Sequence, residues 1–168
     1  MADVCREWEG AVAPAAAAGI RAVGIRIGLV LAPNGGLLGP MLLPFQLGLG
    51  GPLGDGRAWW SWIAIEDVVE AFRFALEHDD LSGAINASAP NPVTNADFAR
   101  TLGRVLGRPT VLSVPRFALR MLFGDEAARE AMLASTRLAP ARLLAAGFRF
   151  GFPELQPALR HELQRSTP

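Results

Sequence analysis

The sequence contains neither lysine nor tyrosine, and all 16 basic residues among its 168 are arginine. These absences exclude several kinds of chemistry. A phosphate-binding Walker A loop needs a lysine, and an enzyme that forms a Schiff base needs a lysine amine. A Tyr-x-x-x-Lys catalytic pair cannot be formed either. We therefore assign no catalytic residue to this chain.

Cysteine and histidine are also scarce. Cys5 is the only cysteine, so the chain can form neither an internal disulfide nor a cysteine-based zinc cluster. His78 and His161 are too far apart in sequence for a local metal motif. A Ser-His-Asp triad is not excluded by residue counts, but no G-x-S-x-G motif supports one. We expect no metal site.

The charges balance, with 16 acidic and 16 basic residues, and the arginines are scattered along the sequence. This distribution does not favour a nucleic-acid partner. The apolar run 13–18 is short, contains Pro14 and follows charged residues, so neither a signal peptide nor a membrane span fits. We expect a cytoplasmic protein whose 51% hydrophobic residues form a substantial core.

Hydrophobic periodicity and turn residues predict an α/β chain that ends in short helices. Residues 94–97 have the form of a capping box, and Gly107 is a typical helix stop. The first part is predicted to contain a helix at 2–18, a buried strand at 21–30, a short helix at 40–49, a tryptophan-rich strand near 59–64, a helix at 65–77, a strand at 83–88 and a helix after Thr94. The last part is predicted to contain helices at 115–123, 125–134, 140–146 and 153–164.

The tryptophan-rich strand is typical of one wall of a small-molecule pocket. On an extended strand Trp60 and Trp62 share one face, while Trp59 and Ser61 share the other. The alternative is that the apolar residues fill a core, that Ser61 bonds to nearby backbone and that Arg57 is solvated. Our predicted substrate-binding residues are Met41, Phe45, Arg57, Trp60, Ser61 and Trp62.

Two charged residues lie in otherwise apolar surroundings. Arg26 falls within the predicted strand, and a buried charge needs a partner. We therefore expect an ion pair with Glu9 or Asp67. Asp67 itself is expected to cap or start the helix 65–77.

Six segments occur in the order seen in one family, and together they span nearly the whole chain. They are V-C-R-E-W-E (4–9), R-I-G-L-V-L-A-P-N-G-G (26–36), G-L-G-G-P-L-G-D-G-R (48–57), S-W-I-A-I-E-D-V-V (61–69), N-A-S-A-P-N-P-V-T-N (86–95) and P-A-R-L-L-A-A-G-F-R-F (140–150). The chain resembles the C-terminal half of NAD-dependent epimerase/dehydratase-like proteins of the extended short-chain dehydrogenase/reductase superfamily, in the branch with a small C-terminal helical domain.

The resemblance implies an extended Rossmann-type, doubly wound fold that binds NAD or NADP on its N-terminal half and closes a smaller half over the substrate. We expect only the C-terminal portion here, with the dinucleotide-binding half absent. Residues 1–112 would form the partial substrate-binding half, and residues 113–168 the helical domain. The glycines at 48–54 have the wrong spacing for a dinucleotide motif and lead into a strand.

The resemblance also implies that Gly28, Leu29 and Val30 lie on the nicotinamide side, although we expect no cofactor to be held by this chain alone. Where the family pattern has glutamine and histidine, this chain has Ala58 and Ala64, which implies a changed or lost specificity. The favoured function is therefore a fragment of an NAD(P)-dependent epimerase, dehydratase or reductase that acts on an unknown small molecule and is inactive alone.

The alternative is a non-enzymatic binding or assembly module. In either case the strand 21–30 would have an unpaired apolar edge. We expect it to cause self-association or to pair with an N-terminal half.

Overall fold

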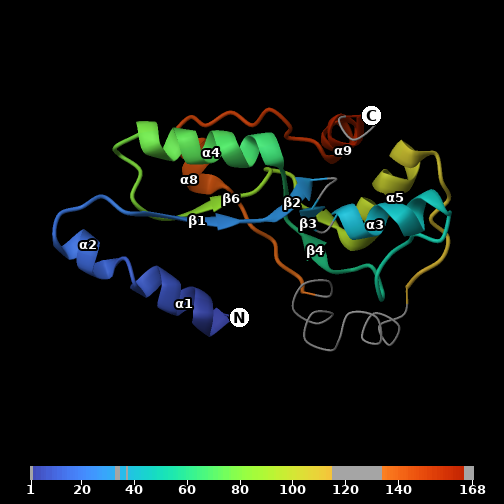
Figure 1. Cartoon of the computed structure of the whole chain (residues 1–168), viewed down its shortest axis with the longest axis horizontal. Coiled ribbons are helices and arrows are strands. Elements are labelled where there is room, and N and C mark those ends of the chain that lie inside the picture. Colours follow the sequence, from blue (N-terminus) through green and yellow to red (C-terminus); the bar gives the residue numbers. More distant parts are fainter. Residues whose placement is uncertain (1, 33–34, 37, 115–133, 165–168) are drawn as a thin grey trace.

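The computed structural model describes residues 2–32, 35–36, 38–114 and 134–164, so most of the helices predicted within 115–134 lie outside the described residues. Figure 1 shows the helices and strands in an α/β arrangement. They are α1 (Ala2–Gly10), α2 (Ala13–Ala17), β1 (Val23–Ile27), β2 (Leu29–Ala32), β3 (Gly35–Gly36), α3 (Leu38–Gln46), β4 (Trp59–Trp60), β5 (Trp62–Ala64), α4 (Ile65–Glu77), β6 (Gly83–Ala87), β7 (Val93–Thr94), α5 (Asn95–Leu106), α8 (Ala141–Ala145) and α9 (Leu155–Gln164).

The prediction of one continuous strand over 21–30 was wrong, because the chain changes partner at Gly28. Strand β1 pairs in parallel with β6, whereas β2 pairs in parallel with β5 and antiparallel with β3. The Gly28 amide donates to the Ala87 carbonyl, and the next amide, of Leu29, donates to the Ser61 carbonyl. The segment therefore joins two small sheets.

The single helix predicted over 2–18 is two short helices. Helix α1 ends at Gly10, and Pro14 lies in the first turn of α2, where a proline needs no amide partner. In Figure 1 both helices extend away from the β1–β6 pair, on the side opposite α4. We call these two helices the α1–α2 arm. Among the described residues, no strand pairs with the edge of β1 opposite β6.

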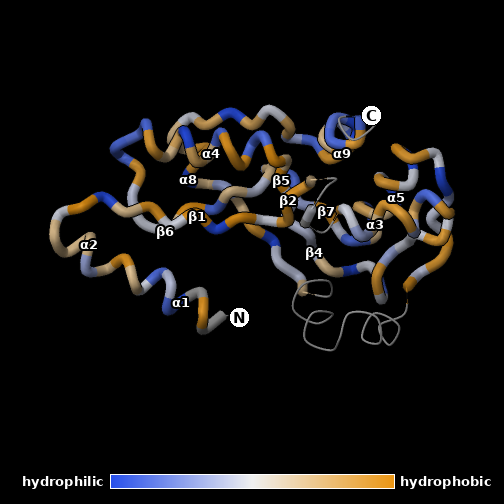
Figure 2. Tube along the Cα trace, in the orientation of Figure 1, coloured by the Kyte–Doolittle hydropathy of each residue, from blue (hydrophilic) through white to orange (hydrophobic). Residues whose placement is uncertain are grey.

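Two hydrophobic cores hold the described part together. One is built around Trp60, Trp62 and Phe98, and the other around Ile63, Ile85 and Phe148. Figure 2 shows hydrophobic and hydrophilic residues alternating along α4, as expected for a helix with one buried face. Each core combines residues from before and after position 112, so the two predicted domains share their cores. The boundary at 112–113 stays a prediction.

Helix α5 follows its predicted signals closely. The Thr94 hydroxyl oxygen accepts a hydrogen bond from the Asp97 amide at 3.1 Å, which is half of a capping box. Gly107 closes the helix in the left-handed region, with φ of 65°. The local signals at both ends therefore predict this helix correctly.

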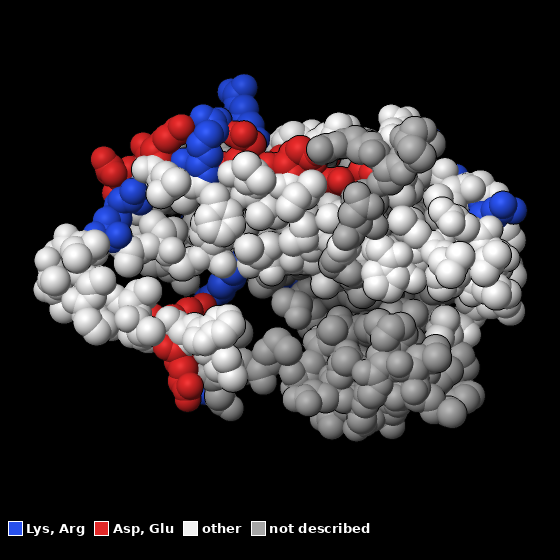
Figure 3. Space-filling view, in the orientation of Figure 1, with Lys and Arg blue, Asp and Glu red and all other residues white. Residues whose placement is uncertain are grey.

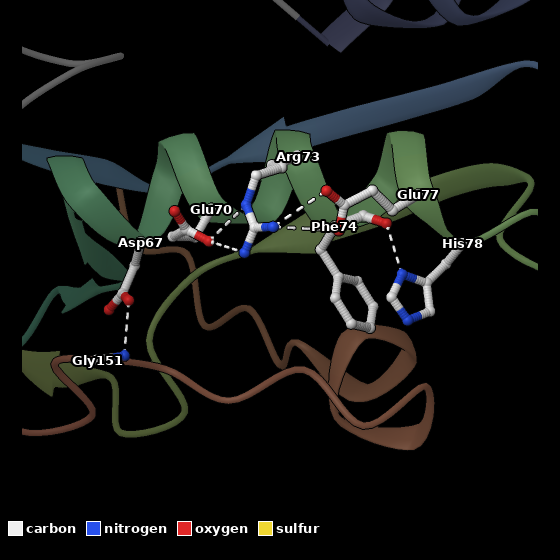
Figure 4. A network of polar contacts seen from close by, with 7 residues as sticks. All are labelled: Asp67, Glu70, Arg73, Phe74, Glu77, His78 and Gly151. Carbon is white, nitrogen blue, oxygen red and sulfur yellow. Dashed lines mark hydrogen bonds and ion pairs between the residues drawn. The ribbon is translucent and has the colours of Figure 1, made fainter.

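Helix α4 is tied to the C-terminal segment by its acidic first turn. Asp67 lies in the first turn, so its expected place at the start of the helix is confirmed, but the N-cap residue is Ala64. Instead the buried Asp67 carboxylate accepts hydrogen bonds from the amides of Gly151 at 2.7 Å and Phe152 at 3.0 Å. Figure 4 shows Asp67 pointing toward Gly151, away from the Glu70–Arg73–Glu77 group on the same helix.

Gly28→Ala should lower the free energy of unfolding by about 1–3 kcal/mol, because overpacking a close backbone contact forces displacement. A Cβ atom at Gly28 would lie 2.5 Å from the Ser61 carbonyl oxygen. The matched control is Gly24→Ala in β1, where no atom lies within 4 Å of an added Cβ. The control should raise stability by about 0.5–1 kcal/mol. Urea denaturation measures both variants, and equal changes in the free energy of unfolding would contradict the close contact between Gly28 and the Ser61 carbonyl.

Candidate functional site

The carboxyl ends of β1 and β6 meet the tryptophan-rich segment at one point, formed by Gly28, Ser61 and Ser88. An added Cβ at Gly28 would lie 3.4 Å from the Ser88 Cβ atom as well as against the Ser61 backbone. The Ser88 side chain is fully buried, and its hydroxyl oxygen has no hydrogen-bond partner among the described residues. In open α/β sheets, ligands bind outside the carboxyl ends of strands, so this junction is the candidate site.

The Ser61 hydroxyl is fully engaged by the segment that precedes α8. It donates a hydrogen bond to the Thr136 carbonyl at 2.8 Å and accepts one from the Leu138 amide at 2.7 Å. This matches the alternative in which Ser61 satisfies backbone groups. The hydroxyl therefore positions residues 136–138 beside the tryptophans, and its predicted contact with substrate stays a prediction.

Trp59 is held by the same segment. Its amide donates to the Ser135 hydroxyl at 3.0 Å, and the Thr136 amide donates to its carbonyl at 3.0 Å. The Arg137 guanidinium lies 4.5 Å from the centre of the Trp59 ring, within the range of a cation–π contact. Residues 135–138 thus run along the edge of β4 that β7 does not occupy.

The other two tryptophans fill the first core. Trp60 and Trp62 are 1% and 0% exposed, and both belong to the same hydrophobic cluster, as their shared face predicts. The Trp62 indole donates to the Asn91 carbonyl at 3.1 Å, whereas the Trp60 indole nitrogen has no hydrogen-bond partner within the described part of the chain. Trp60 also packs edge-on against Phe98, with ring centres 5.0 Å apart.

The remaining predicted substrate-side residues do not all gather in one place. Phe45 is buried in the first core, and Met41 packs against that core while half-buried. Arg57 is exposed, in a turn where its amide donates to the Asp55 carboxylate at 3.1 Å. The core therefore brings Met41 and Phe45 to the tryptophans but leaves Arg57 outside.

The residues predicted to approach a nicotinamide take part in the hydrogen bonding of the sheets. The amides of Gly28 and Leu29 bond to Ala87 and Ser61, and Val30 pairs with β5. A dinucleotide cradle needs free amides at a glycine turn that opens a helix, but the glycine-rich turn at 48–56 leads into β4. Among the described residues, this turn and the residues 28–30 therefore do not form such a cradle.

A groove lies between the α1–α2 arm and the β1–β6 pair. Its cavity of about 680 Å³ is lined mostly by apolar side chains, including Trp8, which is 73% exposed, Val12 and Ile27. Figure 3 shows the hollow beside the arm, where a basic and an acidic side chain meet. Sequence reasoning missed the groove, although the four-residue spacing of Val4, Trp8 and Val12 was a readable signal.

The predicted ion pair of Arg26 is confirmed, with Glu9 as the partner. Two guanidinium nitrogens donate to the two Glu9 carboxylate oxygens at 2.6 and 2.7 Å. This hydrogen bonding lowers the pKa of Glu9 below its usual value. The Arg26 side chain is 53% exposed, so the pair bridges the arm and β1 at the surface and is not buried as expected.

Among the described residues, no group of three His, Cys, Asp or Glu side chains could hold a metal ion. The two histidines are half-buried and pack against aromatic rings: His78 on Phe74, and His161 on Phe152. In the same part of the chain, no helix has the length and apolar character needed to cross a membrane.

The parallel strand pairs flanked by helices, with a junction at the strand ends, define a mixed α/β, Rossmann-like protein. Residues 7–88 match the NAD dependent epimerase/dehydratase family, and residues 114–162 match a domain of unknown function, DUF1731. An epimerase family protein of Mycobacterium leprae is 44% identical over 99% of this chain and 54% of its own length. The chain is therefore similar to epimerase family proteins over nearly its whole length.

Two solved structures are similar to it. Human epimerase family protein SDR39U1, crystallised with NADPH, has a TM-score of 0.82 and 41% identity over 86% of this chain and 49% of its own. A nucleoside-diphosphate sugar epimerase from Corynebacterium glutamicum has a TM-score of 0.74 and 39% identity over 96% of this chain and 30% of its own. The chain thus spans about half the length of the curated relatives it matches.

Ser61→Ala should lower the free energy of unfolding by about 1–3 kcal/mol, because it leaves the Thr136 carbonyl and the Leu138 amide without their partner. The control is Ser82→Ala, an exposed serine, with an expected change within about 0.5 kcal/mol. Chemical denaturation measures both. Hydrogen exchange of the Leu138 amide should also become faster. Unchanged exchange there would contradict the hydrogen bond from this amide to the Ser61 hydroxyl.

Glu162 should make stability depend on pH. Its carboxylate is buried and accepts a hydrogen bond from the Ile65 amide at 3.3 Å; burial raises its pKa above the ordinary value of 4.5. A raised folded-state pKa favours folding below the unfolded pKa, and this advantage disappears as pH rises through the folded pKa. Relative to Glu162→Gln, the free energy of unfolding of the native chain should therefore fall as pH rises above 4.5. Urea denaturation at a series of pH values measures this difference in free energy of unfolding, and a difference that does not change with pH would contradict a raised pKa of Glu162.

Proposed function

We propose that this chain supplies the substrate-binding half of an NAD(P)-dependent epimerase-like enzyme, and that hydride transfer requires a complementary nucleotide-binding half. The family match over residues 7–88 and the NADPH-bound human neighbour support the lineage. The absence of lysine and tyrosine and the engaged amides at Gly28 and Leu29 support the division of roles. The observation that carries the proposal is the open edge of β1 beside an apolar groove.

The open edge has the groups that a further strand needs. The Ala22 carbonyl and the Gly28 amide point toward β6. Because backbone groups alternate along a strand, those of Val23, Ile25 and Ile27 point toward the opposite edge. An added strand would bond to these three residues, and its side chains would cover the groove.

The proposed substrate side comprises the residues predicted from the sequence, with the tryptophan core as its wall. Met41 and Arg57 are the members that are not fully buried and are therefore accessible to a small molecule. The name of the Corynebacterium glutamicum neighbour makes nucleoside-diphosphate sugars the first substrate class to test. A cytoplasmic location is part of the same proposal.

A non-enzymatic assembly module is the second candidate, because the same exposed groove could recruit a partner chain or a second copy. Only the enzyme proposal requires that the partner restore nucleotide binding. Sedimentation of the chain alone shows whether a second copy binds, which tests the second candidate. A dimer that forms through β1 and is unaffected by the complementary half would favour the module.

The chain alone should not bind NADPH, whereas a mixture with the separately produced N-terminal part of the Mycobacterium leprae relative should bind it, as measured by NADPH fluorescence. Ile27→Lys in this chain should weaken the association at least tenfold, because a charged residue on a strand edge opposes further pairing. Ile27 is 42% exposed on the open edge.

The matched control is Leu144→Lys on α8, where the native side chain is 47% exposed away from the groove. It should leave the association unchanged. NADPH binding by this chain alone would overturn the proposal. So would equal weakening by both lysine variants, since the groove would then not be the contact surface.

A further inference from the structure

A second hollow in the molecule is lined by arginines. Its cavity of about 460 Å³ lies beside the end of α5 and is lined by Arg100, Arg104, Arg108, Pro109 and Thr110. None of these lining residues is acidic. None of the residues predicted for cofactor or substrate belongs to the hollow, so it is separate from the Gly28–Ser61–Ser88 junction.

The three guanidinium groups are only partly neutralised. Arg100 contacts the Asp97 carboxylate at 2.5 Å, and Arg104 donates to the Thr101 hydroxyl at 3.1 Å. Within the described part of the chain, Arg104 and Arg108 have no carboxylate partner. Figure 3 shows basic side chains at the α5 end of the molecule with no acidic side chain beside them in that view. Like charges at a spacing of four residues repel each other on a helix.

The backbone that carries these arginines is held tightly. The Arg108 amide donates to the Gly103 carbonyl at 2.9 Å, directly after Gly107 reverses the chain. Gly103 has no room for a side chain, because a Cβ atom there would collide with Thr110 and with the Arg108 carbonyl. The turn 107–110 is therefore packed against α5, and the hollow is preformed.

The helix dipole explains only part of the cluster. Cations are favoured in the last turn of a helix, which accounts for Arg104. Arg100 lies in the middle of α5 and Arg108 lies beyond its end, yet both line the same hollow. Guanidinium groups bind phosphate oxygens through two parallel hydrogen bonds. A small concave site with three of them suits a compact anion with several charges.

We propose that Arg100, Arg104 and Arg108 form a binding site for a diphosphate group. Free pyrophosphate and the diphosphate of a nucleotide both supply this group. Arg104 and Arg108 provide the unneutralised charge, and the packed turn fixes their backbone. An extended acidic peptide fits less well, since the arginines converge on one hollow and do not follow a surface.

The test is calorimetric titration of the whole chain with inorganic pyrophosphate, ADP and adenosine in low salt. Pyrophosphate should bind, adenosine should not, and added salt should weaken the binding because the site is exposed. The double variant Arg104→Gln, Arg108→Gln should lose at least tenfold in affinity, since it removes two charged hydrogen-bonding groups. Tighter binding of ADP than of pyrophosphate would identify a nucleotide as the source, and weaker ADP binding would identify the free anion.

The matched control is the double variant Arg149→Gln, Arg160→Gln, which removes the same charge from exposed positions outside the hollow. It should bind pyrophosphate like the native chain. The single variant Arg108→Gln, beyond the end of α5, provides the comparison if the double variant is unstable. No binding of pyrophosphate, equal losses in both double variants, or a glutamate peptide that binds as tightly would each overturn the proposal. None of these variants alters β1 or its groove.

Discussion

The close approach of Gly28 to the Ser61 carbonyl is the constraint on which the rest of the structure depends. A side chain at this position would displace the Ser61 carbonyl, so the passage of the backbone from one sheet to the other favours a glycine. That passage separates β1 and β6 from β2 and β5 while keeping both pairs parallel. It also places Gly28 beside Ser88 at the carboxyl ends of β1 and β6, where this class of fold binds its ligands.

Several charged and polar side chains in the described part form hydrogen bonds that join segments far apart in the sequence. Ser61 holds residues 136–138, Asp67 holds the amides at 151–152, and Glu162 holds the first amide of α4. In each case one partner lies within 114–162, the range matched by the domain of unknown function. In this chain that range therefore supports the tryptophan-rich segment and the start of α4.

Sequence reasoning succeeded where the signal was local and failed where it was not. The Thr94 cap and the Gly107 stop of α5 are short-range features, and they were correct. The split at Gly28 could not be predicted, because a glycine inside an apolar run is compatible with one strand and the change of partner depends on residues far along the chain. The contacts of Ser61 and Asp67 span 75 to 85 positions, which no local pattern encodes. The Arg26–Glu9 pair was found by reasoning about charge in an apolar strand, but its exposure depended on where the α1–α2 arm lies.

The two candidate functions, an enzyme half and an assembly module, differ in the partner that would cover the surface around β1. Covering the exposed parts of Trp8 and Ile27 would each contribute on the order of 1–3 kcal/mol, and this contribution is the same for any partner that covers them. Apolar burial does not select among partners, because it has no direction. Selection comes from the three residues of β1 whose backbone groups point outward and from the Arg26–Glu9 pair that sets the position of the arm. Under the proposed function, a nucleotide-binding half would supply a strand in register with β1 and leave that ion pair in place.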